Sequence, residues 1–200
     1  MSFSLRVKNE ICRYANMSRE EAVAELSAIM KVSGTLLLGG IKKFGFKIIT
    51  ENAPTARFLF KLLKDKFDIH TKILAKRSNS LKKNHIYEII ISEDGKVRGL
   101  LKEVGILKEE GDIFSLDYSI PRDMVRTDLL KRAYIRGAFL GGGSISNPEK
   151  TYHLEFVTHN DIYAGDLSSL INEYGLNSKI IQRKNSFIVY IKEGEQIVNL

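Results

Sequence analysis

Apolar residues recur along this chain at two spacings, and each spacing predicts a different element. Apolar positions three and four apart share one helical face, whereas alternation of apolar and polar residues is typical of a half-buried strand. The first spacing predicts helices over 4–15, 18–33, 52–67, 95–104 and 126–141, another that starts at 160, and a helical start over 194–200. The second predicts strands over 35–39, 44–50, 70–77, 85–92, 152–158, 177–183 and 186–192. Residues 106–125, which include Pro121, are interpreted as a connector.

Polar residues at the predicted helix starts support these boundaries. Ser18 is followed three residues later by a glutamate, which is the pattern of a capping box. Asn52 and Asn160 hold the N-cap positions of two later helices, and either Ser2 or Ser4 caps the first helix. Capping and periodicity therefore predict the same helix starts.

Two of the predicted helices carry small residues four positions apart and then end at glycine. Residues four apart lie on one face of a helix, so little side chain would hold a neighbouring backbone away. We therefore expect the helix over 18–33 and the helix over 126–141 to cross in close contact as a repeat interface. The small residues of this predicted interface are Ala24, Ala28, Ala133, Gly137 and Gly141.

The order of helices and strands occurs twice, which predicts a duplicated unit of helix, two strands, helix, two strands and helix. We expect the N-terminal helix and first repeat in residues 1–109, and the connector and second repeat in residues 110–200, together forming one pseudo-symmetric domain. The matching positions, 108 residues apart, are Asn52 and Asn160, Leu62 and Leu170, and Ile73 and Ile181.

Composition narrows the function classes. The net charge of +7 and the pI of about 9.4 favour a nucleic-acid partner or an anionic surface, with a merely solvated lysine-rich surface as the alternative. Cys12 is the chain's only cysteine, so an internal disulfide is excluded and a reducing compartment is favoured. No apolar run approaches the roughly 18 residues of a membrane span, and the N-terminus is charged where a signal peptide would be apolar. We expect a cytoplasmic protein.

A long and specific motif lies in the second half, over residues 132–148. Within it, Ile-Arg-Gly-Ala-Phe-Leu-Gly-Gly-Gly at 135–143 resembles the nonapeptide of LAGLIDADG homing endonucleases, and Leu-Ser-Ala-Ile-Met-Lys-Val-Ser-Gly at 26–34 resembles it again. The N-terminal Ser-Phe-Ser, followed by Val7 and Glu10, makes the chain more closely similar to the WhiA family of sporulation and cell-division regulators. The similarity covers essentially all 200 residues.

The resemblance implies an α+β fold in which a duplicated αββαββα unit forms two antiparallel sheets, arranged as a saddle over duplex DNA. It implies a DNA-binding transcription regulator of sporulation and cell division whose C-terminal helix-turn-helix domain does not fit within this chain. We expect double-stranded DNA and other regulatory proteins as partners, no membrane, no cofactor, and a monomeric pseudo-dimer. Two alternatives stay open: a scaffold that binds a protein on the saddle, and an active endonuclease.

Catalysis depends on the two motif helices. In the nuclease family, the penultimate motif residue of each helix is an acidic metal ligand, and the resemblance places Ser33 and Gly142 at those positions. Neither side chain supplies the carboxylate that a divalent ion requires. Glu25 and Asp128 lie two or more helical turns back. We therefore expect no enzyme activity, no catalytic residue and no metal.

A second candidate for metal binding is the run of His153, Glu155 and His159. On a strand, the first two share a face, but His159 falls beyond the strand end. Surface or packing roles are favoured over a metal.

Basic residues gather on the predicted strands and hairpin tips. On the strand over 70–77, alternation puts Lys72 and Lys76 on one face. In the saddle that the resemblance implies, such cations contact phosphates and set affinity and salt dependence. The alternative is that they are only solvated. The predicted DNA-binding residues are Lys42, Lys43, Lys47, Lys72, Lys76, Arg77, Lys82, Lys83, Lys179, Arg183 and Lys184.

Overall fold

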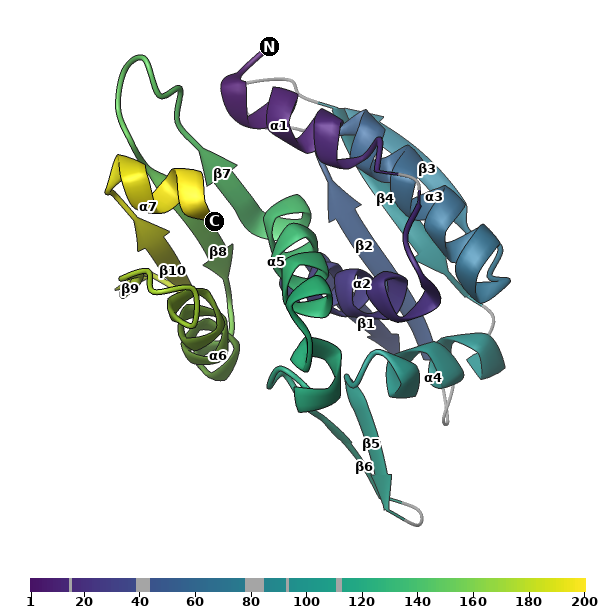
Figure 1. The fold of residues 1–200 in the computed structure, drawn as a ribbon. Helices are drawn as coiled ribbons and strands as arrows, with labels where there is room; N and C mark the ends of the chain where they lie inside the picture. The colour runs from purple at the N-terminus through teal and green to yellow at the C-terminus, as the bar shows by residue number, and fades with distance from the viewer. Residues whose placement is uncertain (15, 39–43, 78–84, 93, 111–112) are drawn as a thin grey trace.

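The computed structural model describes residues 1–14, 16–38, 44–77, 85–92, 94–110 and 113–200 (Figure 1). The first half contains α1 (Phe3–Ile11), α2 (Arg19–Ser33), β1 (Gly34–Leu38), β2 (Phe44–Thr50), α3 (Ala53–Phe67), β3 (Lys72–Arg77), β4 (His85–Ile91) and α4 (Asp94–Glu103). The middle contains β5 (Leu107–Glu110), β6 (Ile113–Leu116) and the 3-10 helix η1 (Arg122–Val125). The second half contains α5 (Asp128–Gly142), β7 (Gly143–Ile145), β8 (Leu154–Thr158), α6 (Asp161–Asn172), β9 (Lys179–Arg183), β10 (Ser186–Ile191) and α7 (Gly194–Asn199).

Two four-stranded antiparallel sheets flank a central pair of helices, which confirms the expected fold class. The strand orders are β1-β2-β4-β3 and β7-β8-β10-β9, so the strands of each half occur in the same spatial order. Helices α2 and α5 lie between the two sheets, and α3 and α6 pack on the sheet of their own half (Figure 1). Within the described part of the chain, no helix is long and apolar enough to cross a membrane.

Each sheet has an inner face against helices and an outer face away from them. In the first sheet, Ile48 pairs with Ile89, and both are fully buried in the core that includes α3 residues. Their chain neighbours Lys47 and Glu88 point the other way, because successive side chains of a strand alternate between faces. In the second sheet, the pairing of buried Phe156 with buried Val189 marks the inner face in the same way.

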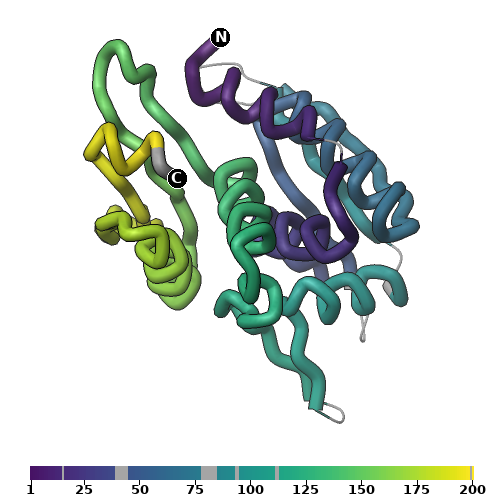
Figure 2. The backbone as a smooth tube through the Cα atoms, viewed as in Figure 1, coloured from purple at the N-terminus to yellow at the C-terminus, as the bar shows by residue number. Residues whose placement is uncertain are grey.

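The interpretation of residues 106–125 as a plain connector is wrong. Strands β5 and β6 form an antiparallel hairpin there, which projects from the body of the molecule, and η1 follows it (Figure 2). The predicted domain boundary at 109/110 therefore falls inside β5, and it stays a prediction. The second half also contains the short strand β7, which the sequence pattern does not indicate because only three residues form it.

Capping holds at most of the predicted positions. Ser18 and the glutamate three residues on form a complete capping box, Ser2 rather than Ser4 caps α1, and Asn160 accepts from an amide of α6. Asn52 holds the predicted N-cap position of α3, but its side chain makes no capping hydrogen bond and donates instead to Asn9, 3.1 Å away. Pro54, in the first turn of α3, has no backbone N–H and so cannot donate a hydrogen bond to a capping side chain. Helix α1 ends at Ile11 instead of continuing to residue 15.

The strand register corrects one of the matched pairs. Ile73 pairs with Ile89 on the inner face of the first sheet. Ile181 pairs with Ile188, which lies on the outer face of the second sheet, whereas Ile180 pairs with inner-face Val189. The position equivalent to Ile73 is therefore Ile180, one residue earlier than the constant spacing indicates.

Candidate nucleic-acid interface

Helices α2 and α5 approach each other through small residues. A Cβ atom added to Gly137 would overlap the backbone carbonyl oxygen of Glu25 and would lie 3.0 Å from the Cβ of Ala28. At Gly141, an added Cβ would lie 3.1 Å from the Cβ of Val32. The remaining small residues of the predicted repeat interface are all fully buried: Ala24, Ala28 and Ala133. The two helix backbones are thus too close at Gly137 for any side chain.

Both helices end at the base of the sheets without a carboxylate. The Ser33 hydroxyl donates to the Ile29 carbonyl one turn back, 2.9 Å away, and so is turned toward its own helix. At Gly142, an added Cβ would overlap the Val157 carbonyl oxygen and would lie 2.5 Å from Cγ1 of Val32. This position therefore has no room for an acidic side chain.

The acids further back on these helices already have partners. Glu25 is fully buried and accepts from Arg136, whose Nη2 and Nε lie 2.8 and 3.1 Å from its Oε2. Burial raises the pKa of Glu25 to about 7, against the opposing effect of Arg136. Asp128 accepts from Arg132 and from the hydroxyl of Tyr174, each at 2.8 Å. No group of three or more His, Cys, Asp or Glu residues in the described ranges could hold a metal ion. The residues at the helix ends thus do not fit the metal site of a nuclease.

The histidine run does not converge on one point. His153 Nε2 lies 3.0 Å from Glu155, and the His153 ring stacks on Tyr190. His159 Nδ1 instead lies 3.1 Å from the backbone carbonyl of Asn185. Packing within the sheet and its turn accounts for all these contacts.

On the outer face of the first sheet, two of the predicted cations share one acidic partner, whose single negative charge offsets half of theirs. Glu88 lies 2.9 Å from Lys76 and 3.9 Å from Lys47, and its side chain is only 14% exposed. The hydrogen bond from Lys76 lowers the pKa of Glu88 and so keeps it ionised. Lys72 shares this face, whereas Arg77 pairs with His85 and so points to the opposite face.

Sequence analysis does not single out Glu88. Alternation along β4 puts it on the outer face, but its contacts with two lysines depend on the cross-strand register.

On the outer face of the second sheet, the predicted cations have no acidic partner among the residues that the structure describes. Lys179 pairs with Tyr190 and Arg183 with Ser186, which places both cations on the face opposite Val189. Lys184 follows in the turn with a φ of 55°. All three are exposed, and none forms an ion pair within the described ranges. The other predicted cations lie outside the described residues: Lys42, Lys43, Lys82 and Lys83.

Comparisons with known proteins match both halves. A family model described as the WhiA N-terminal LAGLIDADG-like domain matches residues 19–107, and one described as the WhiA LAGLIDADG-like domain matches residues 131–200. The probable cell division proteins WhiA of Clostridium botulinum (strain Hall) and Clostridium novyi (strain NT) are 67% and 66% identical to this chain over 200 residues. Each match covers 100% of this chain and 63% of the relative, so the chain spans less than two thirds of their length.

Solved structures show the same fold. Full-length DUF199/WhiA from Thermatoga maritima aligns with a TM-score of 0.75 at 21% identity, over 100% of this chain and 60% of that one. The homing endonuclease I-DmoI in complex with DNA and Mn aligns with a TM-score of 0.59 at 12% identity, over 90% of this chain and 94% of that one. At these identities, the likeness concerns the fold alone.

Proposed function

This chain belongs to the WhiA family, and from that premise we propose that it is a non-catalytic, duplex-DNA-contacting unit of a bacterial transcription regulator of cell division and sporulation. We further propose that it acts in the cytoplasm as a monomer whose two repeats meet at the α2–α5 crossing. Other regulatory proteins are its second class of partner.

The observation that carries this proposal is the unpaired positive charge on the outer face of the second sheet. Lys179 and Arg183 lie on that face and Lys184 in the turn beside them, all exposed and without ion-pair partners in the described ranges. Exposed cations contact phosphates, position a protein on a duplex and release counterions. The homing endonuclease I-DmoI, which shares the fold, is known in a complex with DNA.

The proposed contact is asymmetric. In the first sheet, the single negative charge of Glu88 offsets part of the charge on Lys47 and Lys76 before any phosphate approaches. In the second sheet, the cations are free to replace counterions on the duplex. We therefore assign the leading role in DNA contact to the second repeat.

The absence of catalysis follows from the two helix ends. A hydrolytic metal site of this kind needs a carboxylate at the end of each central helix, close to the scissile phosphate. Ser33 and Gly142 occupy those places, and the backbone of β8 fills the space beside Gly142. Glu25 is held in its ion pair with Arg136, away from solvent.

A salt titration with a fluorescent DNA duplex tests the proposal. We expect log K to fall steeply with log salt, and the K179A/R183A variant to lower that slope by about 1.8, or about 0.9 for each lost contact. The matched control, R57A/K64A, removes one arginine and one lysine from α3, on the far side of the first sheet, and should leave the slope unchanged. A wild-type chain without salt-dependent binding overturns the proposal.

A protein-binding scaffold is the second candidate function. It is favoured by partly exposed apolar side chains on the outer face of the first sheet, namely Leu37 at 36%, Ile49 at 37% and Leu74 at 43% exposure. Absence of DNA binding in the titration would favour this alternative.

A further inference from the structure

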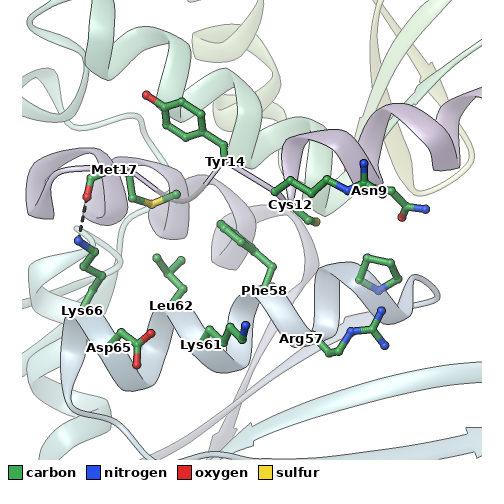
Figure 3. A pocket seen from close by; sticks show the side chains of 12 residues that line it. Asn9, Cys12, Tyr14, Met17, Arg57, Phe58, Lys61, Leu62, Asp65 and Lys66 are labelled. Carbon is green, nitrogen blue, oxygen red and sulfur yellow. Dashed lines mark hydrogen bonds between the residues drawn. The ribbon is translucent and has the colours of Figure 1, made fainter.

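A groove lies between α3 and the residues Asn9, Cys12, Arg13, Tyr14 and Met17 (Figure 3). Its volume is about 550 Å³, within the range of ligand-binding clefts. It extends along α3 from Pro54 to Lys66, which is roughly 18 Å at the rise of an α-helix. Helix α3 packs on the inner face of the first sheet, so the groove lies away from the outer face that carries Lys47 and Glu88.

Two rows of residues on α3 give the groove an apolar floor and a charged rim. Residues four apart on a helix lie one above the other, so Phe58 and Leu62 continue one row. Both side chains are less than one-tenth exposed, and Met17 from the opposite wall is buried beside them. Arg57 and Lys61 form the neighbouring row, which is exposed to solvent. A ligand would thus meet carbon at the base and cations along one edge.

Hydrogen bonds tie the two walls together at both ends. At one end, Asn52 donates to Asn9 at 3.1 Å, and Cys12 lies 3.7 Å from the hydroxyl of Thr55. At the other end, Lys66 donates to the backbone carbonyl of Met17 at 2.8 Å, as Figure 3 shows. The groove is therefore preformed, which lowers the entropic cost of binding.

The lining charge is strongly unbalanced. Arg13, Arg57 and Lys61 form no ion pair within the described ranges, and Lys66 is engaged only with a carbonyl. Asp65 is the one acid among the lining residues. Three unpaired cations beside an apolar floor are complementary to a ligand that carries both carboxylates and apolar side chains.

We propose that this groove binds an acidic, amphipathic helical segment of a partner protein. A twelve-residue helix is about 18 Å long and so matches the groove in length. Its apolar side chains, three and four residues apart, lie on the floor of Phe58 and Leu62, in the manner of other helix-in-groove complexes. Its carboxylates pair with Arg57 and Lys61. Duplex DNA is a poorer fit, because its rigid, charged backbone has nothing apolar to place on the floor.

The test is a selection from a random dodecamer peptide library on the immobilised chain, with the R57E/K61E variant as counter-target. Both residues are exposed, so charge reversal leaves the core intact. We expect enriched peptides with net negative charge and apolar residues at helical spacing. We expect binding of such a peptide to weaken at least tenfold in Lys61→Glu but to stay near wild type in Lys64→Glu, a matched exposed lysine of α3 that does not line the groove.

Cys12 supplies an independent readout of occupancy, because it lines the groove and is the only cysteine. Its alkylation by iodoacetamide should slow in the presence of the enriched peptide. Three results would each overturn the proposal. They are enriched peptides without acidic bias, equal binding of the peptide to Lys61→Glu and Lys64→Glu, and an unchanged rate of Cys12 alkylation in the presence of the peptide. Protection of Cys12 by a DNA duplex in place of the peptide would assign the groove to nucleic acid. None of these outcomes depends on the outer faces of the sheets.

Discussion

Replacing Gly137 with alanine tests the close approach of α2 and α5 most directly. The added methyl would overlap the Glu25 carbonyl oxygen and lie 2.9 Å from its carbon and 3.0 Å from the Cβ of Ala28. Two of these three atoms belong to the backbone, so no side-chain rotation relieves the overlap. The two helices must separate, or α2 must bend, before the variant can fold.

Two effects of opposite sign set the magnitude. Alanine in a helix interior is favoured over glycine by about 1 kcal/mol. Overpacking a close contact costs about 1–3 kcal/mol or more, and the upper part of that range applies because the obstacle is backbone. The net loss of about 2 kcal/mol corresponds to a decrease in Tm of roughly 4–8 °C for a chain of this size.

Gly165→Ala is the matched control. Gly165 also lies inside a helix, α6, but an added Cβ there has no atom within 4 Å. This variant should gain about 0.5–1 kcal/mol from helix propensity alone, and its Tm should rise by a few degrees. Thermal unfolding followed by circular dichroism measures both. A Gly137→Ala protein as stable as Gly165→Ala would refute the close crossing.

Three further predictions concern charge and chemistry. Glu88→Gln should remove the one negative charge that Lys47 and Lys76 share, and so steepen the salt dependence of DNA binding by about 0.9. Affinity near 0.1 M salt should then rise roughly 8-fold. An unchanged slope in a titration that detects wild-type binding would contradict the assigned asymmetry. Burial raises the pKa of Glu25 to about 7 from an ordinary 4.5. The contribution of protonated Glu25 to the free energy of unfolding is therefore fully present below pH 4.5 and is lost as the pH rises through 7. Glu25→Gln should therefore flatten the change in Tm between pH 5 and pH 8, and an unaltered profile in the variant would contradict the assigned titration. The chain should leave duplex DNA intact with Mg²⁺ or Mn²⁺, and cleavage that persists through purification and is lost in Glu25→Gln would show that a displaced acid is active.

Local patterns predicted most helices and strands and their repeated order, because helical periodicity, strand alternation and caps depend on near neighbours. Ser18 and Asn160 show this, since each cap bonds an amide three residues away. The arrangement of the strands in two antiparallel sheets was predicted by the family resemblance. The β5–β6 hairpin escaped prediction because Leu107–Glu110 is mostly charged and its apolar partners on β6 are exposed. Ile113 is 75% exposed, so the burial pattern by which a strand is recognised is absent.

The candidate sites depend on contacts that no local pattern specifies. Glu88 lies near Lys47 and Lys76 only because β4 is flanked by both β2 and β3 in one register. The groove exists only because Met17 packs near Lys66, 49 positions later in the chain. Sequence analysis can identify the charged residues, but the topology decides which of them are neutralised.

The tight packing around Gly142 has an evolutionary consequence. A single nucleotide change turns a glycine codon into an aspartate or glutamate codon, so mutation supplies an acid at this place readily. The folded protein rejects it, because even the Cβ of the new residue would overlap the Val157 carbonyl and lie 2.5 Å from Val32. Strand β8 would have to shift before an acid could be accepted, and such a shift has no advantage without the acid. In this chain, an acid at position 142 would therefore require a coordinated change in β8.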